Sequence, residues 1–178
     1  GSYDHMINYV STAEEYIKNR SGVFKTSDGN ILRGKNKGSI RELLPIVRGL
    51  VSKNNSYILS FKSNKNILDF MDNKRAKKYM NEGTITPDHV IRIKPFPLFI
   101  GREKFKKNIK VKKLLKNEIN KYREKYERYF IQNSNKSGTS KIMLDSCPNI
   151  IFLQDVGMIA VGKTKKESQI AIDIAEQN

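Results

Sequence analysis

Residues suited to metal and redox chemistry are nearly absent from this chain. It contains one cysteine, Cys147, and two histidines, His5 and His89. One thiol excludes a disulfide framework within the chain and a zinc site built from several thiolates. The simplest setting for such a protein is a reducing compartment, and we therefore predict a cytoplasmic location.

Long apolar runs and acidic residues are scarce as well. No apolar stretch approaches the length of a membrane-spanning helix and no secretory signal is visible, so we expect no membrane partner. The formal net charge is +16, from 34 Lys and Arg residues against 18 Asp and Glu residues. Such an excess fits a nucleic-acid partner. However, the basic residues are mostly lysine, asparagine is abundant and tryptophan is absent, which favours a compositional bias of the surface over a dedicated polyanion site.

The ends of the chain lead us to expect a fragment of a larger protein. Residues 1–6, GSYDHM, are typical of a cloning remnant, so His89 is left as the native histidine. The remaining residues, 7–178, suffice for a single module with a core of its own. The missing native start and the abrupt stop at Gln177 and Asn178 suggest that the natural protein extends further.

The hydrophobic pattern predicts helices alternating with strands. Apolar residues at helical spacing predict helices over 7–20, 41–53, 64–82, 108–133 and 165–177. An S-x-x-E box at Ser39 and Glu42 would open the second of these helices. Pro45 must then lie in or near its first turn, or kink it.

Strands are expected in three places. The first covers 56–61, and a β-rich run up to Ile100 follows a turn at Thr86–Asp88, although Pro95 and Pro97 prevent regular pairing across it. The last apolar segment is split by Asp155–Gly157, which predicts a hairpin. The composition of 21–38 and 133–141 is typical of loops. Strands alternating with helices indicate a layered α/β domain.

The segment GMIAVGKT, Gly157–Thr164, matches the G-x-x-x-x-G-K-[ST] pattern of phosphate-binding loops. Such a loop turns its backbone N–H groups around phosphates, with the lysine on the terminal phosphates and the threonine on magnesium. Here the residues between the glycines are Met-Ile-Ala-Val, which favour an extended strand. The acidic strand end that usually completes the magnesium site has no place in the 14 residues after Thr164. A P-loop nucleotide-binding protein is therefore the least favoured alternative.

The same stretch resembles the class II aldolase/adducin family. In that family a strand ends in Asn-His-Gly, a second strand runs into Gly-Lys-Thr or Gly-Lys-Ser, and an acidic helix follows. The sequence IIFLQDVGMIAVGKTKKESQIAIDIAE has its glycines, Lys163 and Thr164 in these places. It departs from the pattern at Val156, where active aldolases carry a zinc-binding histidine. Because those enzymes hold their metal through three histidines, the resemblance implies a module that has lost its metal site.

A wider resemblance covers almost the whole native chain. It looks like the middle region of rhamnulose-1-phosphate aldolase/lactaldehyde dehydrogenases, which fuse a class II aldolase to a short-chain dehydrogenase. The segments that carry it include AEEYI (13–17), LLPIVRGLVS (43–52), TPDHVIRIKPFPLFI (86–100), YREKYERYF (122–130) and PNIIFLQDVGMIAVGK (148–163). The resemblance implies a single three-layer α/β domain with a mixed sheet.

The resemblance also implies a role without catalysis. Zinc and NAD are implied for the neighbouring domains of the parent protein, a lyase and oxidoreductase of rhamnose metabolism, and no cofactor is implied for this chain. Its partners would be the flanking catalytic domains of the same chain, or further copies in a homo-oligomer. The chain has no G-x-G-x-x-G segment of its own, and we expect it to be inactive alone.

The segment around His89 is the best candidate for a ligand site. If this segment is a strand, Arg92 and Lys94 share a face and could hold a phosphate or carboxylate between them. Histidine is also the side chain suited to acid–base work near neutrality. The predicted pocket, for a small phosphorylated sugar, consists of His89, Arg92 and Lys94, with Asp88, Arg48 and Lys163 in second rank. The alternative is a turn or helix cap at Asp88, with His89 bonded to backbone groups.

The lysine-rich run, the tyrosine stripe and the single cysteine can each be explained either by a function or by the needs of folding. The lysine-rich run over 104–116 could bind phosphates of RNA or a membrane surface, but it is more typical of a solvated helix face. Polyanion binding therefore remains the alternative function. Tyr122, Tyr126 and Tyr129, at helical spacing, are more typical of a core stripe than of an aromatic platform. Cys147 has no histidine close to it in the sequence that would activate it as a nucleophile.

Overall fold

The structure, a computed structural model, describes residues 2–20, 40–52, 55–105, 110–137 and 141–178. The chain divides into two compact units, residues 1–32 and residues 33–178. The first contains α1 (Ser2–Arg20), which confirms the helix predicted over 7–20 and begins inside the segment interpreted as a cloning remnant. The predicted loop over 21–38 lies outside the described residues. None of the described helices combines the length and the apolarity needed to cross a membrane.

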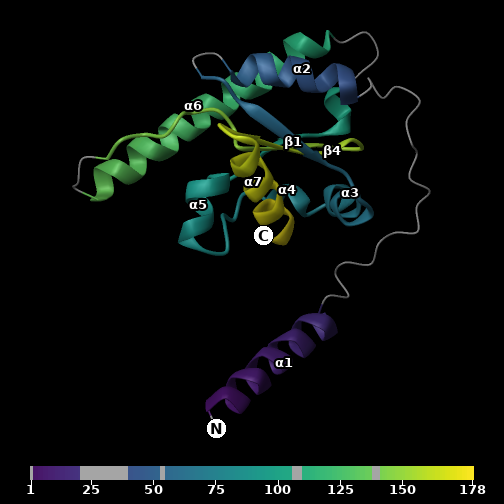
Figure 1. Ribbon diagram of the computed structural model, residues 1–178, viewed down its shortest axis with the longest axis vertical. Coiled ribbons are helices and arrows are strands. Elements are labelled where there is room, and N and C mark those ends of the chain that lie inside the picture. Colours follow the sequence, from purple (N-terminus) through teal and green to yellow (C-terminus); the bar gives the residue numbers. More distant parts are fainter. Residues whose placement is uncertain (1, 21–39, 53–54, 106–109, 138–140) are drawn as a thin grey trace. The chain divides into compact units, whose positions relative to one another are not determined.

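A four-stranded mixed sheet forms the centre of the second unit (Figure 1). Its strands are β1 (Ile58–Lys62), β2 (Leu98–Ile100), β3 (Ile150–Leu153) and β4 (Gly157–Gly162), in the spatial order β1-β4-β3-β2. β4 pairs antiparallel with both β1 and β3, whereas β2 runs parallel to β3. The predicted C-terminal hairpin and the predicted first strand are confirmed.

The two central strands carry a hydrophobic core on each face of the sheet. Every residue of β3 and β4 is buried, which explains why both segments are continuous apolar runs. Along β3, Ile151 and Leu153 join one core cluster, whereas Ile150 and Phe152 join the other. This alternation follows from the two-residue period of a pleated strand.

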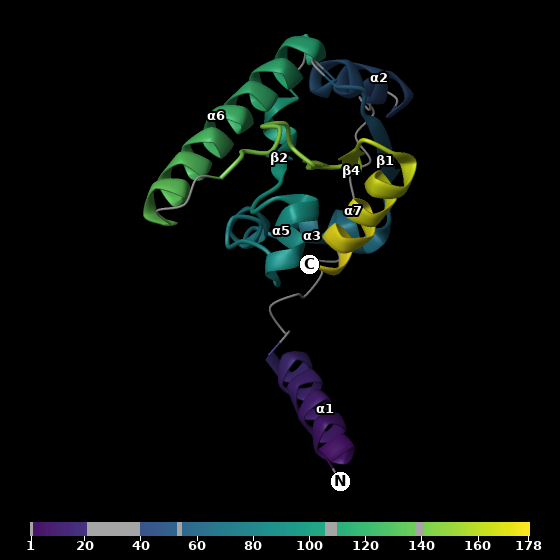
Figure 2. The same ribbon diagram turned by 60° about the vertical axis from the view of Figure 1, so that its left-hand side comes forward.

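Helices cover both faces of the sheet and complete three layers (Figure 2). The first core cluster includes residues of α2 (Ile40–Val51) and α6 (Val111–Ser137). The second includes residues of α3 (Lys65–Asp72), α4 (Ala76–Tyr79), α5 (Pro87–Ile93) and α7 (Lys165–Gln177). A 3-10 helix, η2 (Arg102–Lys104), follows β2. The predicted fold class, a three-layer α/β domain with a mixed sheet, is confirmed.

The segment from Pro87 to Ile93 is a helix, so the β-rich run predicted there is wrong. Thr86 is the N-cap residue, and Pro87 occupies the first turn, where a missing N–H group is tolerated. These start signals outweigh the strand preference of the Val-Ile-x-Ile run. The strand is confined to β2, which begins after Pro97.

Three element boundaries differ in smaller ways. The helix predicted over 64–82 is divided into α3 and α4 near Asn73, whose side chain accepts a hydrogen bond from the backbone N–H of Arg75 at 2.8 Å. α6 continues to Ser137, beyond the predicted start of a loop at 133. Pro45 lies inside α2, beyond its first turn but near it. The predicted cap at Ser39 lies outside the described residues.

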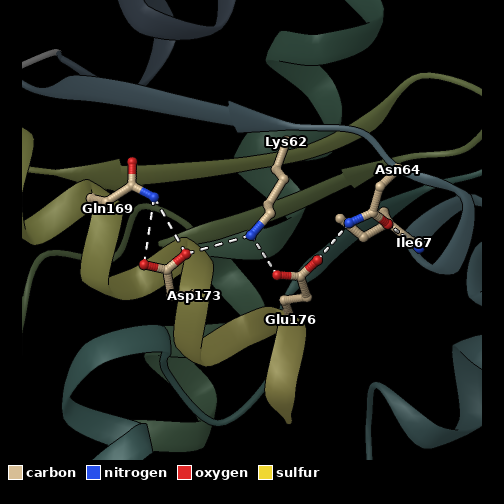
Figure 3. A network of polar contacts seen from close by, with 6 residues as sticks. All are labelled: Lys62, Asn64, Ile67, Gln169, Asp173 and Glu176. Atoms are coloured by element: carbon tan, nitrogen blue, oxygen red, sulfur yellow. Dashed lines mark hydrogen bonds and ion pairs between the residues drawn. The ribbon is translucent and has the colours of Figure 1, made fainter.

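A polar network fastens the last helix to the edge of the sheet (Figure 3). Lys62 Nζ, at the end of β1, lies 2.5 Å from Glu176 Oε2 and 3.6 Å from Asp173 Oδ1 on α7. Asn64 donates to Glu176 Oε1 at 2.6 Å and accepts from the N–H of Ile67 at 2.9 Å, so it also caps α3. The hydrogen bond from Lys62 holds the pKa of Glu176 below its ordinary value. Three elements are thus joined by one exposed cluster of charges and amides.

Candidate functional site

The Gly-Lys-Thr segment lies at the junction of β4 and α7, and it serves the helix. Thr164 is the N-cap of α7, and its side-chain oxygen accepts from the backbone N–H of Glu167 at 3.1 Å. Glu167 Oε2 accepts in turn from the backbone N–H of Lys163 at 2.8 Å. This reciprocal pair is a variant of the capping box. The side chain of Lys163 is exposed.

The residues between the two glycines form a central strand. Met158–Ala160 pair with β1 on one side and β3 on the other, so the backbone of this segment belongs to the sheet ladder. A Cβ atom on Gly157 would lie 2.7 Å from the carbonyl oxygen of Lys62, and one on Gly162 would lie 2.4 Å from the backbone N of Ser168. The glycines therefore permit close packing of β1 and α7 against β4. This geometry is not that of a phosphate-binding loop.

The turn between β3 and β4 contains the departure from the aldolase pattern. Val156, which stands where the resembled enzymes carry a zinc-binding histidine, is half-buried and packs against the first core cluster. Its N–H donates to the carbonyl of Leu153 at 3.0 Å. The neighbouring Asp155 and Gly157 have φ angles of 67° and 145°, a region that side chains rarely adopt. The side chain at this position is thus apolar and packs on the core.

An arginine bridges this turn to the end of α3. Arg102 pairs with Asp72 and lies 3.1 Å from Asp155 Oδ1. Gln154 Oε1 accepts from the N–H of Arg102 at 3.1 Å, and Gln154 Nε2 donates to the Met71 carbonyl at 3.1 Å. One guanidinium therefore forms ion pairs with both Asp72 and Asp155 beside the turn. Within the described part of the chain, no three His, Cys, Asp or Glu side chains are grouped so that they could hold a metal ion.

The residues of the predicted anion site do not lie on a strand. Arg92 is in the last turn of α5, and Lys94 follows that helix with a φ angle of 64°. The premise that the two share one strand face is therefore wrong. Arg92 is exposed, whereas only 2% of Lys94 is exposed. Binding of an anion by these residues stays a prediction.

His89 has a partner at the far end of the chain. Its Nδ1 lies 3.3 Å from Asn178 Oδ1, which also accepts from the N–H of Ile85 at 2.8 Å. Asp88 is exposed in the first turn of α5, where a negative charge is favourable. These contacts hold the start of α5 against the end of α7, and a ligand at His89 stays a prediction.

Arg48 ties α2 to the beginning of β1. It lies in the last turn of α2, and its Nε donates to the carbonyl of Tyr57 at 2.9 Å. It also lines an open groove of about 1160 Å³ between α2 and β1, together with Arg41 and Leu44. No pattern in the sequence indicates this groove.

Lys94 is the centre of a buried polar cluster that the sequence did not reveal. Its Nζ donates to the carbonyls of Asp145 and Cys147 and lies 4.3 Å from the centre of the Tyr126 ring. Burial lowers the pKa of Lys94 to about 8, against the opposing attraction of the Asp145 carboxylate. Amines with such a pKa can act as bases or nucleophiles. Here the amine is directed at backbone carbonyls, so its visible role is to hold the 145–147 segment on the core.

Cys147 is held in its thiol form. Its Sγ accepts from Arg123 at 3.0 Å and donates to the carbonyl of Val51 at 3.3 Å. Burial raises the pKa of this thiol above its ordinary value, which disfavours the reactive thiolate. One local signal for the cluster was present: Asp145 accepts from the N–H of Cys147 at 2.7 Å, a bond typical of an Asp two residues before its partner.

The tyrosines of α6 belong mainly to the core, as predicted. Tyr122 and Tyr126 are 4% and 6% exposed, and the Tyr122 hydroxyl donates to the carbonyl of Phe96 at 3.0 Å. Tyr129 packs edge-on against the ring of Phe96 but is 37% exposed. The tyrosine stripe of α6 therefore does not form an exposed aromatic platform.

The central mixed sheet between two helical layers, the buried hairpin and the capped helix after Gly-Lys-Thr define a three-layer α/β domain. A family model described as "Aldolase class II, second domain" matches residues 38–178. Because that match covers more than half of the chain, the chain belongs to this family. The predicted boundary at residue 7 stays a prediction.

One relative among the curated proteins is the "Uncharacterized oxidoreductase YuxG" of Bacillus subtilis (strain 168). It is 25% identical to this chain over 174 residues, which are 95% of this chain and 25% of the relative. The chain therefore spans about a quarter of the length of that protein. No solved structure matches the chain.

Proposed function

We propose that this chain is a non-catalytic, aldolase-like module of a longer protein that combines a sugar-phosphate aldolase with a short-chain dehydrogenase. The module packs the flanking catalytic domains together or builds a homo-oligomer. Family membership and the partial coverage of an oxidoreductase-named relative support this proposal. By resemblance, the parent acts on rhamnulose 1-phosphate and uses zinc and NAD in its other domains, in the cytoplasm.

The observation that carries the proposal is the state of the β3–β4 turn. Val156 packs against the core, and both nearby carboxylates, Asp72 and Asp155, are paired with Arg102. A zinc aldolase site needs an open coordination position surrounded by neutral imidazoles. Ion pairs and apolar packing instead make this turn a stable surface against which another domain can rest.

The mass of the natural protein tests the proposal directly. An antibody raised against this chain should detect, in the source cells, a band several-fold larger than 20.5 kDa. A band near 20.5 kDa would contradict the module and would describe a free-standing protein. Cleavage of a ketose 1-phosphate by the purified chain with added zinc would contradict the absence of catalysis.

A substitution in the β3–β4 turn distinguishes two explanations for the absence of a zinc site. Either the turn lacks only a histidine ligand, or its ion pairs and packing prevent zinc binding. Val156→His restores one imidazole, but Asp72 and Asp155 remain paired with Arg102. We expect no stoichiometric zinc binding in calorimetric titration and a lower melting temperature, because a half-buried apolar side chain becomes polar. Wild-type protein titrated in parallel is the control. One-to-one zinc binding by the variant would show that the turn is still a metal site.

The anion pocket and the polyanion surface can be tested in the same way. We propose that a phosphorylated sugar, if it is bound near α5, contacts His89 and the exposed Arg92, because the Lys94 amine is directed at two carbonyls. Arg92→Ala should then weaken binding of the sugar phosphate in a calorimetric titration. A gel shift with duplex DNA that persists at physiological salt would instead favour the nucleic-acid alternative.

A further inference from the structure

The outer edge of β1 carries backbone groups that point away from the sheet. β1 ends the sheet order, and β4 is its neighbour among the described strands. The N–H of Val161 in β4 donates to the carbonyl of Asn149, directly before β3, at 2.8 Å. Residues opposite each other in an antiparallel pair turn their backbone groups either toward each other or away from each other. Because Val161 lies opposite Leu59, Leu59 turns its N–H and C=O outward, and Phe61, two residues later, does the same.

The end of α2 closes this edge at Tyr57. Tyr57 precedes Leu59 by two residues, so its backbone groups also point outward. Its N–H donates to Ser52 Oγ at 3.2 Å, and its carbonyl accepts from Arg48 Nε at 2.9 Å. Among the described residues, the outward backbone groups of Leu59 and Phe61 have no hydrogen-bond partner. The open part of the edge is therefore the window from Leu59 to Phe61.

The described residues of this window lack the usual protection of an edge strand. Natural edges are kept from pairing by lysine side chains, prolines or bulges. β1 contains no proline, and its register with β4 is continuous. Lys62, the charged residue of β1, lies beyond the window, and its amine is directed at Glu176 and Asp173 of α7 (Figure 3). The opposite edge of the sheet is shorter, because β2 has three residues and begins directly after Pro97.

The window is apolar on the face that α2 covers. Leu59 and Phe61 are half-buried and pack against the first core cluster, so part of each side chain remains in contact with solvent. Ser60 points to the other face, where its Oγ lies 2.8 Å from Ser168 Oγ. A strand with apolar side chains at the same two-residue spacing would cover Leu59 and Phe61 best. β1 of a second copy has this spacing.

We propose that two copies of the chain pair antiparallel through β1, about a two-fold axis at Ser60. The axis places Leu59 opposite Phe61 of the partner subunit, and each such pair exchanges two main-chain hydrogen bonds. The two four-stranded sheets then form one continuous sheet. The partner's β1 fits the window, because Lys62 of the partner subunit lies opposite Ile58 and the strand ends there, before Tyr57. This contact specifies the homo-oligomer of the proposed function and rests on that proposal.

Sedimentation equilibrium of the whole chain measures the pairing. We expect the mass to rise with protein concentration from 20.5 kDa toward twice that value. The dimer fraction should increase between about 50 mM and about 300 mM sodium chloride, because two chains of charge +16 repel each other. Hydrogen exchange at the Leu59 and Phe61 amides should slow as the dimer forms, and the Ser60 amide, which faces β4, should change less. A mass that stays at 20.5 kDa up to about 1 mM protein would overturn the proposal.

Two charged variants test the register. Leu59→Glu and Phe61→Lys should each dimerise at least about tenfold more weakly than the wild type, because a charge then lies against an apolar side chain in both pairs. An equimolar mixture should associate about tenfold more tightly than either variant alone, since the new glutamate of one chain lies opposite the new lysine of the other and the second pair stays apolar. Circular dichroism checks that each variant is folded.

The control is Asn117→Glu, which adds one negative charge at an exposed position on α6 and should dimerise like the wild type. An equal loss in this control, undiminished pairing of Leu59→Glu, or a mixture of folded variants that stays monomeric would each overturn pairing through β1. These outcomes are separate from the test of the proposed function. A monomeric chain leaves the mass of the natural protein unaffected, whereas a natural band near 20.5 kDa overturns the module and leaves the sedimentation results unaffected.

Discussion

At the scale of single residues, Lys94 shows how position in the fold decides chemistry. The same side chain on the surface would be an ordinary cation, but here it follows a helix with a positive φ angle and points into the core. Two carbonyls and an aromatic ring favour its charged form. Removal from water disfavours that form more strongly, so the pKa falls to about 8. Lys94 therefore stabilises the 145–147 segment, but its amine loses its proton more easily than that of an exposed lysine.

The lowered pKa predicts an unusual pH dependence of stability. The folded-state pKa of Lys94, about 8, lies below the ordinary value of 10.5. Between these values the unfolded chain binds more protons, so the free energy of unfolding should rise with pH. We expect Lys94 to contribute a rise of about 1 kcal/mol between pH 8 and pH 9. Urea unfolding at several pH values measures it.

The matched variant for this test is Lys94→Met, which keeps the stem of the side chain and removes the amine. It should be less stable at pH 7 by about 2 kcal/mol, because two buried carbonyls lose their donor, and it should lack the rise. The raised pKa values of Cys147 and Tyr57 act in the opposite direction at higher pH. The effect of Tyr57 is common to both proteins and cancels in the difference, whereas that of Cys147 cancels only in part, because Cys147 interacts electrostatically with Lys94. A parallel pH dependence of the two proteins would contradict the assignment to Lys94.

At the scale of elements, the β4 glycines show why the Gly-Lys-Thr pattern is present without a nucleotide. Gly157 has a φ angle of 145°, and a Cβ atom there would meet both the carbonyl of Lys62 and the ring of Phe61 within 3 Å. Gly162 meets the backbone of α7 in the same way. Close packing of β1 and α7 against the two ends of β4 is therefore enough to require glycine at both positions, without a bound nucleotide.

Substitution of two glycines should therefore have opposite effects. Gly157→Ala combines a strained backbone with a clash against backbone atoms, so it should lower the free energy of unfolding by about 2–4 kcal/mol. Gly49→Ala, within α2 and with nothing inside 4 Å of a new Cβ, should raise it by about 0.5–1 kcal/mol. Urea midpoints measure both changes. A neutral effect of Gly157→Ala would mean that β1 does not lie against this strand.

The elements also show which parts of the fold the sequence determines by itself. The hairpin and α7 follow from a turn between two apolar runs and from Thr164 with Glu167, which are local signals. α5 was missed because β-branched residues such as Val90 and Ile91 favour a strand, whereas Thr86 and Pro87 start a helix. The choice depends on packing of this segment against α7, which lies far away in the chain.

At the scale of the whole molecule, the sequence predicted the fold class better than the sites. Layers follow from periodicity, but a buried cluster depends on pairs such as Lys94 and Cys147, which are 53 residues apart. The groove depends likewise on α2 lying beside an edge strand. Neither arrangement leaves a pattern in a single segment, so both required the three-dimensional structure.

Net charge is a property of the whole molecule with a consequence for stability. Because 34 basic residues face 18 acidic ones, the chain has an excess of 16 positive charges, and the mutual repulsion of these cations opposes the compact state. Exposed pairs such as Lys62–Glu176 are weakened by salt, but each contributes little. The repulsion should therefore decide the sign of the salt dependence.

We expect the urea midpoint to rise as sodium chloride increases from about 20 mM to about 300 mM, since the Debye length falls from about 20 Å to about 6 Å. Urea is the appropriate denaturant because it is uncharged and leaves the repulsion unscreened. The control is Lys77→Glu, which lowers the net charge by two at an exposed position. It also removes a positive charge that, after burial, is the second cause of the lowered pKa of Lys125. Its salt response should be smaller than that of the wild type. A midpoint that falls with salt would show that the ion pairs at Lys62 and Arg102 outweigh the repulsion among the excess cations.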